Sequence, residues 1–364
     1  MSDTLHLWMR HESRPTERRA PLTPGDAGRL VRQGARITVE ESDRRVFPAA
    51  DYAAAGCATA PAGSWESAPD DAYVLGLKEL PGGPDAPALR HRHIYFGHAY
   101  KGQSGAAGLL ARFTAGGGAL LDMEYLTDDT GRRVAAFGYW AGYVGAALAV
   151  LHRRGRLTAP LAPTGRPALD ALLAPAAGGD AADTAALVVG ALGRSGRGAC
   201  DALTAAGLTP TRWDVAETRR IDRPALLGHD LLVNTVLTVR PVPPFLTHED
   251  LDAPGRRLSV VSDVTCDVTS ACNVLPVYEE TTTWEEPVRR LREAGPAAPA
   301  ADLIAIDNLP SLLPAEASTA FSAELAPQLA RLTDTDPVWA RALHTFRTAA
   351  AGVTTTAQEA SLVR

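Results

Sequence analysis

A short apolar run that ends in a cluster of glycines places the tightest constraint on the fold of this chain. The run over 185–189 is followed by four glycines, which are Gly190, Gly193, Gly196 and Gly198. Apolar spacing over 199–206 then predicts a helix, and Gly207 suits the position just beyond its end. Glycines allow a sharp turn and a close approach of a pyrophosphate, and the N-terminus of the next helix offers it free N–H groups. The pattern predicts a strand, turn and helix that bind a dinucleotide.

An acidic residue follows at the distance that such a site requires. The segment 208–213 is strand-like and ends at Asp214, which lies 214 − 190 = 24 residues after Gly190. An acid about 20 residues after the first glycine binds the ribose hydroxyls. The residues expected to contact the cofactor are Gly190, Leu192, Gly193, Arg194, Gly196 and Asp214. The spacing is GxxGxxG rather than GxGxxG, so a glycine turn in a domain that binds no nucleotide is the alternative.

The choice of dinucleotide depends on charge. A carboxylate at Asp214 repels the 2′-phosphate of NADP and favours NAD. Three arginines nearby would tolerate NADP, and they are Arg212, Arg219 and Arg220. We expect NAD.

Length and composition exclude several classes of function. A chain of 364 residues with 46% hydrophobic residues is long enough for two domains with real cores. A net charge of −6 without a basic stripe argues against nucleic acid as a partner. No apolar run reaches the roughly 18 residues of a membrane span, and the N-terminus is polar, so we expect a cytoplasmic protein. The four cysteines lack zinc-site spacing, so free thiols and no metal site are expected.

Helix and strand patterns alternate along the chain. Strands are expected over 37–40, 73–77, 94–96, 119–122, 231–234, 258–261 and 302–306. Helices are expected over 24–33, 106–114, 143–152, 315–332 and 337–351. This alternation predicts parallel sheets. The Pro-, Gly- and Ala-rich stretch 155–182 is interpreted as a loose connection, and His91 and His93 as exposed loop residues.

Three consecutive strands of the first third are followed by residues suited to proton transfer. Lys78, His98 and Glu124 each come shortly after an expected strand. Ligands of open parallel sheets bind at the carboxyl ends of the strands, so the three side chains are candidates for one site. Taken singly, a lysine or histidine at a strand end is usually a solvated surface residue.

Two pairs of arginines are candidates for binding anions. They are Arg18 with Arg19 and Arg132 with Arg133. Arginine binds carboxylates through two parallel hydrogen bonds and keeps its charge when buried. In each pair one side chain could face a cleft and the other solvent, although any single arginine could equally be a surface charge.

Seven segments together resemble the saccharopine dehydrogenases of the lysine-forming, fungal type. They are 17–24, 76–81, 96–103, 131–138, 190–194, 213–214 and 306–318. The blocks run in order over nearly the whole chain, and the run Ile306–Pro314 is especially specific. The wider clan includes alanine dehydrogenase and transhydrogenase.

This resemblance implies an α/β fold of two Rossmann-like, doubly wound domains with a cleft between them. Residues 1–136, completed by C-terminal helices over 326–364, would form the substrate domain, and residues 137–325 the NAD-binding domain. The implied activity is the NAD-dependent oxidative cleavage of saccharopine to L-lysine and 2-oxoglutarate, or the reverse reductive amination.

The resemblance also implies a role for individual residues. Lys78 matches the base that accepts a proton from the secondary amine, and His98 matches the acid–base group of imine hydrolysis. Lys101 and Glu124 match neighbours that tune this pair. Arg19 and Arg133 match arginines that hold the substrate carboxylates. Phe137 and Asp307 match residues that line the substrate site.

The chain departs from the fungal pattern in places, and these departures leave alternatives open. Ser195 and Thr235 stand where that family has cysteines. The residues that would bind lysine cannot be placed, so an opine-type enzyme that joins 2-oxoglutarate to another amine is one alternative. An alanine dehydrogenase-like enzyme and a non-catalytic nucleotide sensor are others. Only small-molecule partners are expected, and a monomer is favoured.

Overall fold

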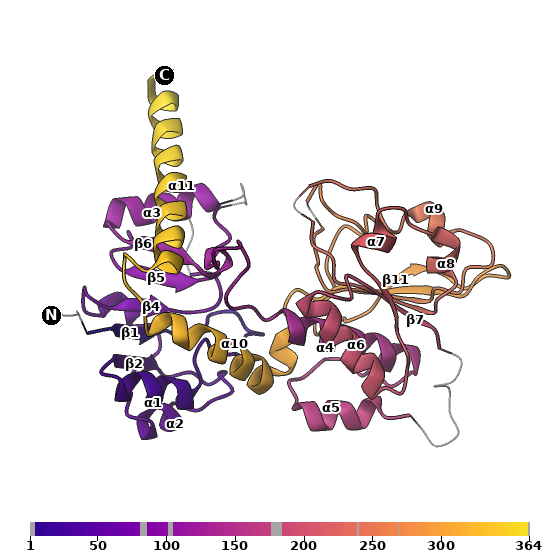
Figure 1. The fold of residues 1–364 in the computed structure, drawn as a ribbon, viewed down its shortest axis with the longest axis horizontal. Helices are drawn as coiled ribbons and strands as arrows, with labels where there is room; N and C mark the ends of the chain where they lie inside the picture. Colours follow the sequence, from indigo (N-terminus) through magenta and orange to yellow (C-terminus); the bar gives the residue numbers. More distant parts are fainter. Residues whose placement is uncertain are drawn as a thin grey trace. The chain divides into compact units, whose positions relative to one another are not determined.

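The chain folds into two compact units, each built around a sheet whose strands are all or mostly parallel (Figure 1). The computed structural model describes residues 4–80, 86–100, 105–175, 184–238, 240–268 and 270–362. Unit 1 comprises Met1–Ala136 with Ser318–Arg364, and unit 2 comprises Phe137–Ala317. Lys101, one of the candidate site residues, lies outside the described residues.

The sheet of unit 1 has six parallel strands in the order β3-β2-β1-β4-β5-β6. Its strands are β1 (His6–Met9), β2 (Arg36–Glu40), β3 (Ala58–Ala60), β4 (Tyr73–Leu75), β5 (Arg92–Tyr95) and β6 (Ala119–Asp122). Its helices are α1 (Pro24–Arg32), α2 (Ala49–Ala54), η1 (Ser64–Ser67), α3 (Ala106–Gly116), η2 (Met123–Tyr125), most of α10 (Pro314–Leu329) and α11 (Pro337–Leu362). Because the strands are parallel, all of their carboxyl ends lie at one edge of the sheet.

Local chemistry explains where α1 begins and ends. The hydroxyl of Thr23 accepts a hydrogen bond from the backbone N–H of Asp26 at 3.2 Å, and Pro24 occupies the first helical position. Gly34 adopts a φ of 99°, a conformation that favours glycine and stops the helix. The helix predicted over 24–33 is confirmed to within one residue.

Helix α10 carries the chain back into unit 1. The hydroxyl of Ser318 accepts from the N–H of Ala20, and that of Ser322 accepts from the N–H of Thr23, both at 2.9 Å. These bonds attach α10 to the segment before α1, and the second unit accordingly ends at Ala317, whereas the sequence placed its end at 325.

The prediction that His91 and His93 are exposed loop residues is wrong. The relative exposure of His91 is 2% and that of His93 is 0%. His93 lies inside β5, between β4 and β6, where residues on both faces of a parallel sheet are covered. Its ring packs edge-on against Trp65 and Phe113, with centroids 5.2 and 5.3 Å away.

The sheet of unit 2 also has six strands, in the order β11-β12-β10-β9-β7-β8. They are β7 (Ala186–Val189), β8 (Thr211–Trp213), β9 (Leu231–Asn234), β10 (Val260–Asp263), β11 (Arg289–Arg292) and β12 (Ala301–Ile304). All neighbours are parallel except β11 and β12. Its helices are α4 (Gly138–Arg153), α5 (Arg166–Leu173), α6 (Arg194–Ala205), α7 (Val215–Thr218), α8 (Arg223–Leu227), α9 (His248–Leu251) and η3 (Leu309–Leu312).

Two hydrophobic cores cover the two faces of this sheet. Alternate residues of β7 belong to different cores, with Val188 packed in the core of α4 and α6, and Leu187 and Val189 in the other. Strand side chains alternate between faces, so a four-residue apolar strand supplies both cores. The sheet is therefore doubly wound, as predicted.

Helices α4 and α6 pack unusually closely, with glycines at the crossing. A Cβ added to Gly142 would overlap the carbonyl of Ser195, and one added to Gly198 would overlap the carbonyl of Tyr139. Only glycine permits this backbone approach. Gly198, which the sequence assigned to the phosphate turn, therefore serves helix packing.

The described part of the stretch 155–182, residues 155–175, contains a helix that the sequence did not indicate. Helix α5 forms within it, because Leu169 and Leu173, one turn apart, are buried in the core of α4 and α6. Among the described residues, no helix has the length and apolar character that crossing a membrane requires.

Candidate active site

The carboxyl ends of β4, β5 and β6 bring three of the predicted residues to one edge of the unit 1 sheet. Lys78, His98 and Glu124 follow these neighbouring strands. The His98 Nδ1 atom lies 3.4 Å from Oε2 of Glu124. The side chain of His98 is 59% exposed and that of Glu124 is 15% exposed, so the imidazole is accessible and its carboxylate partner is mostly covered. A carboxylate beside an accessible imidazole is suited to acid–base work.

Asp122, at the end of β6, connects the two members of this pair. Its carboxylate accepts hydrogen bonds from the backbone N–H of His98 at 3.1 Å and of Glu124 at 2.9 Å. His98 has a φ of 49°, which is costly for a non-glycine residue and persists only where its surroundings hold it. Burial raises the pKa of Asp122, against the hydrogen bond from Glu124 and the charge of His98.

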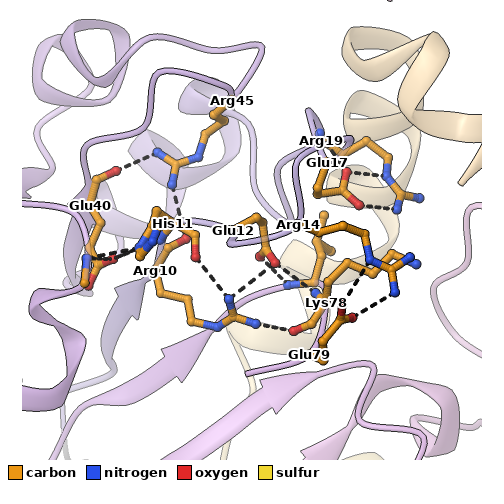
Figure 2. A network of polar contacts seen from close by, with 12 residues as sticks. Arg10, His11, Glu12, Arg14, Glu17, Arg19, Glu40, Arg45, Lys78 and Glu79 are labelled. Atoms are coloured by element: carbon orange, nitrogen blue, oxygen red, sulfur yellow. Dashed lines mark hydrogen bonds and ion pairs between the residues drawn. The ribbon is translucent and has the colours of Figure 1, made fainter. Parts of the chain in front are cut away.

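Lys78 lies near two pairs of oppositely charged side chains, Glu17 with Arg19 and Glu79 with Arg14 (Figure 2). Burial raises the pKa of Glu17, but the charge and hydrogen bonds of Arg19, helped by the charge of Lys78, outweigh it and bring the pKa down to about 2. Glu17 is thus an anion near Lys78 throughout the physiological range. Opposite charge nearby favours the protonated form of a lysine.

Arg19 is buried against Glu17. Its Nε donates to Oε1 of Glu17 at 2.8 Å, and its relative exposure is 5%. Glu79, the residue after Lys78, accepts hydrogen bonds from Arg14 at both carboxylate oxygens, at 3.0 and 3.1 Å. Both arginines lie at the same edge of unit 1 as Lys78 (Figure 2).

The remaining predicted substrate residues are divided between the units. Arg133 is half-buried in unit 1, in an isolated antiparallel bridge with Thr127. Phe137 is half-buried in unit 2, where it caps α4. Asp307 is exposed in unit 2, shortly after β12.

The glycine turn of unit 2 has the expected form of strand β7, turn and helix α6. Gly190 has a φ of 83°, and a Cβ at Gly196 would overlap the carbonyl of Gly190. Gly193 caps α6, Arg194 begins it, and the side chain of Leu192 is 69% exposed at the tip. The turn therefore presents backbone N–H groups and the N-terminus of a twelve-residue helix, which suits a pyrophosphate.

Asp214, expected to contact ribose, also organises this turn. Its Oδ2 accepts from the backbone N–H of Leu192 at 2.9 Å, which ties the tip of the turn to the end of β8. Its Oδ1 accepts from Val215 at 2.9 Å, and Glu217 accepts from the N–H of Asp214 at 2.8 Å, so the residue caps α7. A carboxylate fixed in this way can accept hydrogen bonds from ribose hydroxyls.

Thr235 also holds this turn. Its hydroxyl donates to the carbonyl of Val189 at 2.8 Å and lies 3.2 Å from that of Gly190. All four cysteines of the chain are free thiols. Within the described ranges, no three His, Cys, Asp or Glu side chains cluster in a way that could hold a metal ion.

Lysine usage is a signal in the sequence that the motifs alone do not reveal. The chain has 36 Lys and Arg residues, but only Lys78 and Lys101 are lysines. Arginine stays charged at every physiological pH, whereas a lysine whose pKa is lowered can release and accept a proton. A chain that uses arginine for nearly every positive charge therefore marks its two lysines as candidates for proton chemistry.

Comparisons with known proteins identify the family. Residues 8–144 match the family model described as the alanine dehydrogenase/PNT N-terminal domain. Saccharopine dehydrogenase (NAD+, L-lysine-forming) of Schizosaccharomyces pombe is 41% identical over 94% of this chain and 98% of its own length. The enzyme of the same name from Candida glabrata is 40% identical over 95% of this chain and 96% of its own length.

A solved structure shares the fold. An L-alanine dehydrogenase superposes with a TM-score of 0.65 at 15% identity, covering 94% of both chains. With two Rossmann-like sheets of the predicted type and full-length relatives at about 40% identity, the chain belongs to the saccharopine dehydrogenase (NAD+, L-lysine-forming) family.

Proposed function

We propose that this chain is an NAD-dependent oxidoreductase that interconverts saccharopine and water with L-lysine and 2-oxoglutarate. The observation that carries the proposal is the set of Lys78, His98 and Glu124 on neighbouring strand ends of a chain whose full-length relatives bear that name. The chemistry needs positioned proton transfer at an amine and at an imine but no metal.

The glycine turn of unit 2 fits NAD. A Cβ at Gly196 would overlap the Gly190 carbonyl, so the close approach of α6 to the turn needs glycine. Gly190, Gly193 and the first residues of α6 would hold the pyrophosphate, Leu192 would pack against the nucleotide, and Asp214 would bind ribose. When bound, the nicotinamide accepts a hydride from the carbon that bears the secondary amine.

Proton transfer belongs to unit 1. Lys78 accepts the proton of the secondary amine as the carbon–nitrogen bond becomes an imine. His98 assists addition of water to the imine and then donates a proton to the departing amine of lysine, while Glu124 holds and tunes the imidazole. Lys101 would support the same steps.

Substrate carboxylates need fixed positive charge. Arg19 and Arg133 would hold the carboxylates of the 2-oxoglutarate part, since a guanidinium binds a carboxylate through two bonds. Phe137 and Asp307, which the family resemblance assigns to substrate binding, are proposed as further substrate-binding residues. Free thiols are usual in a reducing compartment, which supports a cytoplasmic location.

The first test is turnover of saccharopine with NAD+ by purified protein, followed as NADH absorbance. The double variant Lys78→Met with His98→Gln should lose activity by about 100-fold or more, since each group contributes roughly 10²-fold or more. Lys78→Arg is the matched control for charge, because it keeps the cation but cannot accept a proton. A double variant with wild-type turnover would show that the site is elsewhere.

A further inference from the structure

The peptide group of Lys78 is held from both sides by two buried side chains. A terminal nitrogen of Arg10 donates to the carbonyl of Lys78. The carboxylate of Glu12 accepts from the N–H of Lys78 at 3.0 Å through Oε2 and from the N–H of Leu77 at 2.7 Å through Oε1. Both residues come from the segment that follows β1, the strand next to β4 (Figure 2). The backbone that carries Lys78 is therefore fixed by charged groups.

The guanidinium of Arg10 is itself fixed. It donates to the carbonyl of His11 at 3.0 Å and to Glu12 at 3.3 Å, and it stacks 5.6 Å from the ring centroid of Tyr95. A Cβ at Gly76 would come within 2.5 Å of Arg10 Nε, so a larger residue there would displace the guanidinium. The residue is only 2% exposed, so the protein encloses this side chain almost completely.

The pKa of Glu12 lies above its usual value, so its partners offset the cost of burying a carboxylate only in part. Burial raises its pKa, the charge of Arg10 opposes this rise, and the carboxylate of Glu17 adds to it. A buried ion pair contributes little net stability compared with apolar side chains of the same size. Stability alone therefore gives no reason to place Arg10 and Glu12 on this peptide.

We propose that Arg10 and Glu12 form a clamp on the Lys78 peptide that sets the direction from which the Lys78 amine meets the substrate. They are positioning residues, since they touch the lysine backbone and not the reacting atoms. This inference rests on the proposed function of Lys78 as the base. Misplacing a reacting group by about 1 Å can cost about 100-fold in rate.

Two variants loosen the clamp in different ways. Glu12→Gln removes the carboxylate and turns an amide NH2 towards a backbone N–H, so one of the two hydrogen bonds from Leu77 and Lys78 is lost. Arg10→Lys keeps the charge but lacks the fork that reaches several acceptors at once. We expect kcat for saccharopine to fall by about 10- to 100-fold in each, with KM changed by less than about 3-fold, because placement of the base is lost rather than substrate binding.

Glu40→Gln is the matched control. Glu40 is a buried carboxylate of the same unit that also accepts from backbone N–H groups, those of His11 at 2.9 Å, Gly63 at 2.9 Å and Trp65 at 2.6 Å, but it does not bond Lys78. We expect this variant to lower Tm as the clamp variants do and to keep the wild-type kcat and pH profile.

The scarcity of lysine supplies a second readout that does not depend on turnover. In the wild type, reductive methylation with 13C labels only Lys78, Lys101 and the N-terminal amine, and Lys78→Arg assigns the Lys78 signal. Arg10→Lys adds one further labelled amine, which is identified by its absence from the wild-type spectrum. In Glu12→Gln we expect the Lys78 signal to titrate at lower pH than in the wild type, because a nearby negative charge is lost. Glu40→Gln should leave it unchanged.

The two readouts separate failure of the clamp from failure of the proposed function. A wild type that does not turn over saccharopine contradicts the function, while a Lys78 signal that responds to Glu12→Gln and Arg10→Lys still supports the clamp. Wild-type kcat, pH profile and Lys78 signal in both variants would overturn it. If Glu12→Gln does not fold, Arg10→Lys and Gly76→Ala, which displaces Arg10, decide by the same criteria.

Discussion

The carboxylate of Asp122 accepts a hydrogen bond from the backbone N–H of His98 at 3.1 Å, at a residue whose φ is 49°. The same carboxylate accepts from the N–H of Glu124, so one buried side chain holds both partners of the imidazole–carboxylate pair. Placement of His98 thus depends on a residue that the substrate need not touch.

Asp122→Asn tests this dependence. The amide offers one acceptor oxygen where the carboxylate offers two, so either the His98 or the Glu124 bond is lost. We expect kcat to fall by about 10-fold or more, because the proposed acid–base group His98 is displaced while the proposed cofactor turn in unit 2 is untouched. Asp222→Asn is the control, since Asp222 caps α8 in unit 2 and asparagine caps equally well. Unchanged kcat in Asp122→Asn would show that His98 holds its place without it.

His93 predicts how stability depends on pH. Burial lowers its pKa well below the usual value, and the charges of Arg10, His91 and Arg112 add to the effect. Neither ring nitrogen has a hydrogen-bond partner among the described residues. The imidazole is neutral in the folded chain and takes up a proton on unfolding below about pH 6.5. The stability that depends on a neutral His93 is therefore complete above about pH 6.5. It is lost as the pH falls from there towards the pKa of His93 in the folded chain.

His93→Phe should remove this contribution. We expect the free energy of unfolding of the wild type to fall, relative to the variant, by up to about 1.4 kcal/mol per pH unit below pH 6.5. Urea unfolding at several pH values measures the difference, and His344→Gln, at an exposed position, serves as control. Parallel pH curves for wild type and His93→Phe would contradict the burial of a neutral imidazole.

Two glycine-to-alanine substitutions should have opposite effects. A Cβ at Gly196 would overlap the backbone of the glycine turn, whereas Gly108, inside α3, has nothing within 4 Å. We expect Gly196→Ala to lower Tm and weaken NADH binding, and Gly108→Ala to stabilise by about 0.5–1 kcal/mol, as alanine does in a helix. Thermal unfolding and NADH titration measure both. Wild-type NADH affinity in Gly196→Ala would argue against the turn as the pyrophosphate site.

Asp214 predicts the choice of dinucleotide. Asp214→Ser keeps a helix-capping hydroxyl but removes the charge that repels a 2′-phosphate. We expect the ratio of kcat/KM for NADP+ to that for NAD+ to rise by about 10-fold or more. Glu217→Gln, which keeps the bond between Asp214 and Leu192, should leave the ratio unchanged. An equal response in the two variants would remove Asp214 from the cofactor site.

The fold could be predicted where each strand and helix carries its own signal. Local sequence is enough to predict the glycine turn, the Thr23 cap and the apolar strands of both sheets. The burial of His91 and His93 could not be predicted in this way. Whether a histidine in a central strand is buried depends on the side chains that cover the strand, and for His93 these are Trp65 and Phe113. Helix α5 was missed because its short apolar spacing lies in a stretch rich in proline and glycine.

The site was predicted less completely than the fold. Lys78, His98 and Glu124 follow from their places after strands, and parallel pairing brings such places together. Arg10 and Glu12 lie in a segment without periodicity. Nothing in the sequence indicates that their side chains are buried against the backbone of Lys78, which follows β4, three strands further along the chain. Their role depends on the pairing of β1 with β4, which only the fold shows.

The central claim is most directly tested by NADH oxidation with 2-oxoglutarate against a panel of amino acids and amines. We predict that lysine supports the highest kcat/KM and that Lys78→Met with His98→Gln abolishes this rate. Ammonium with pyruvate supporting faster oxidation than any amino acid with 2-oxoglutarate would contradict the account and place the chain with amino-acid dehydrogenases that use free ammonia.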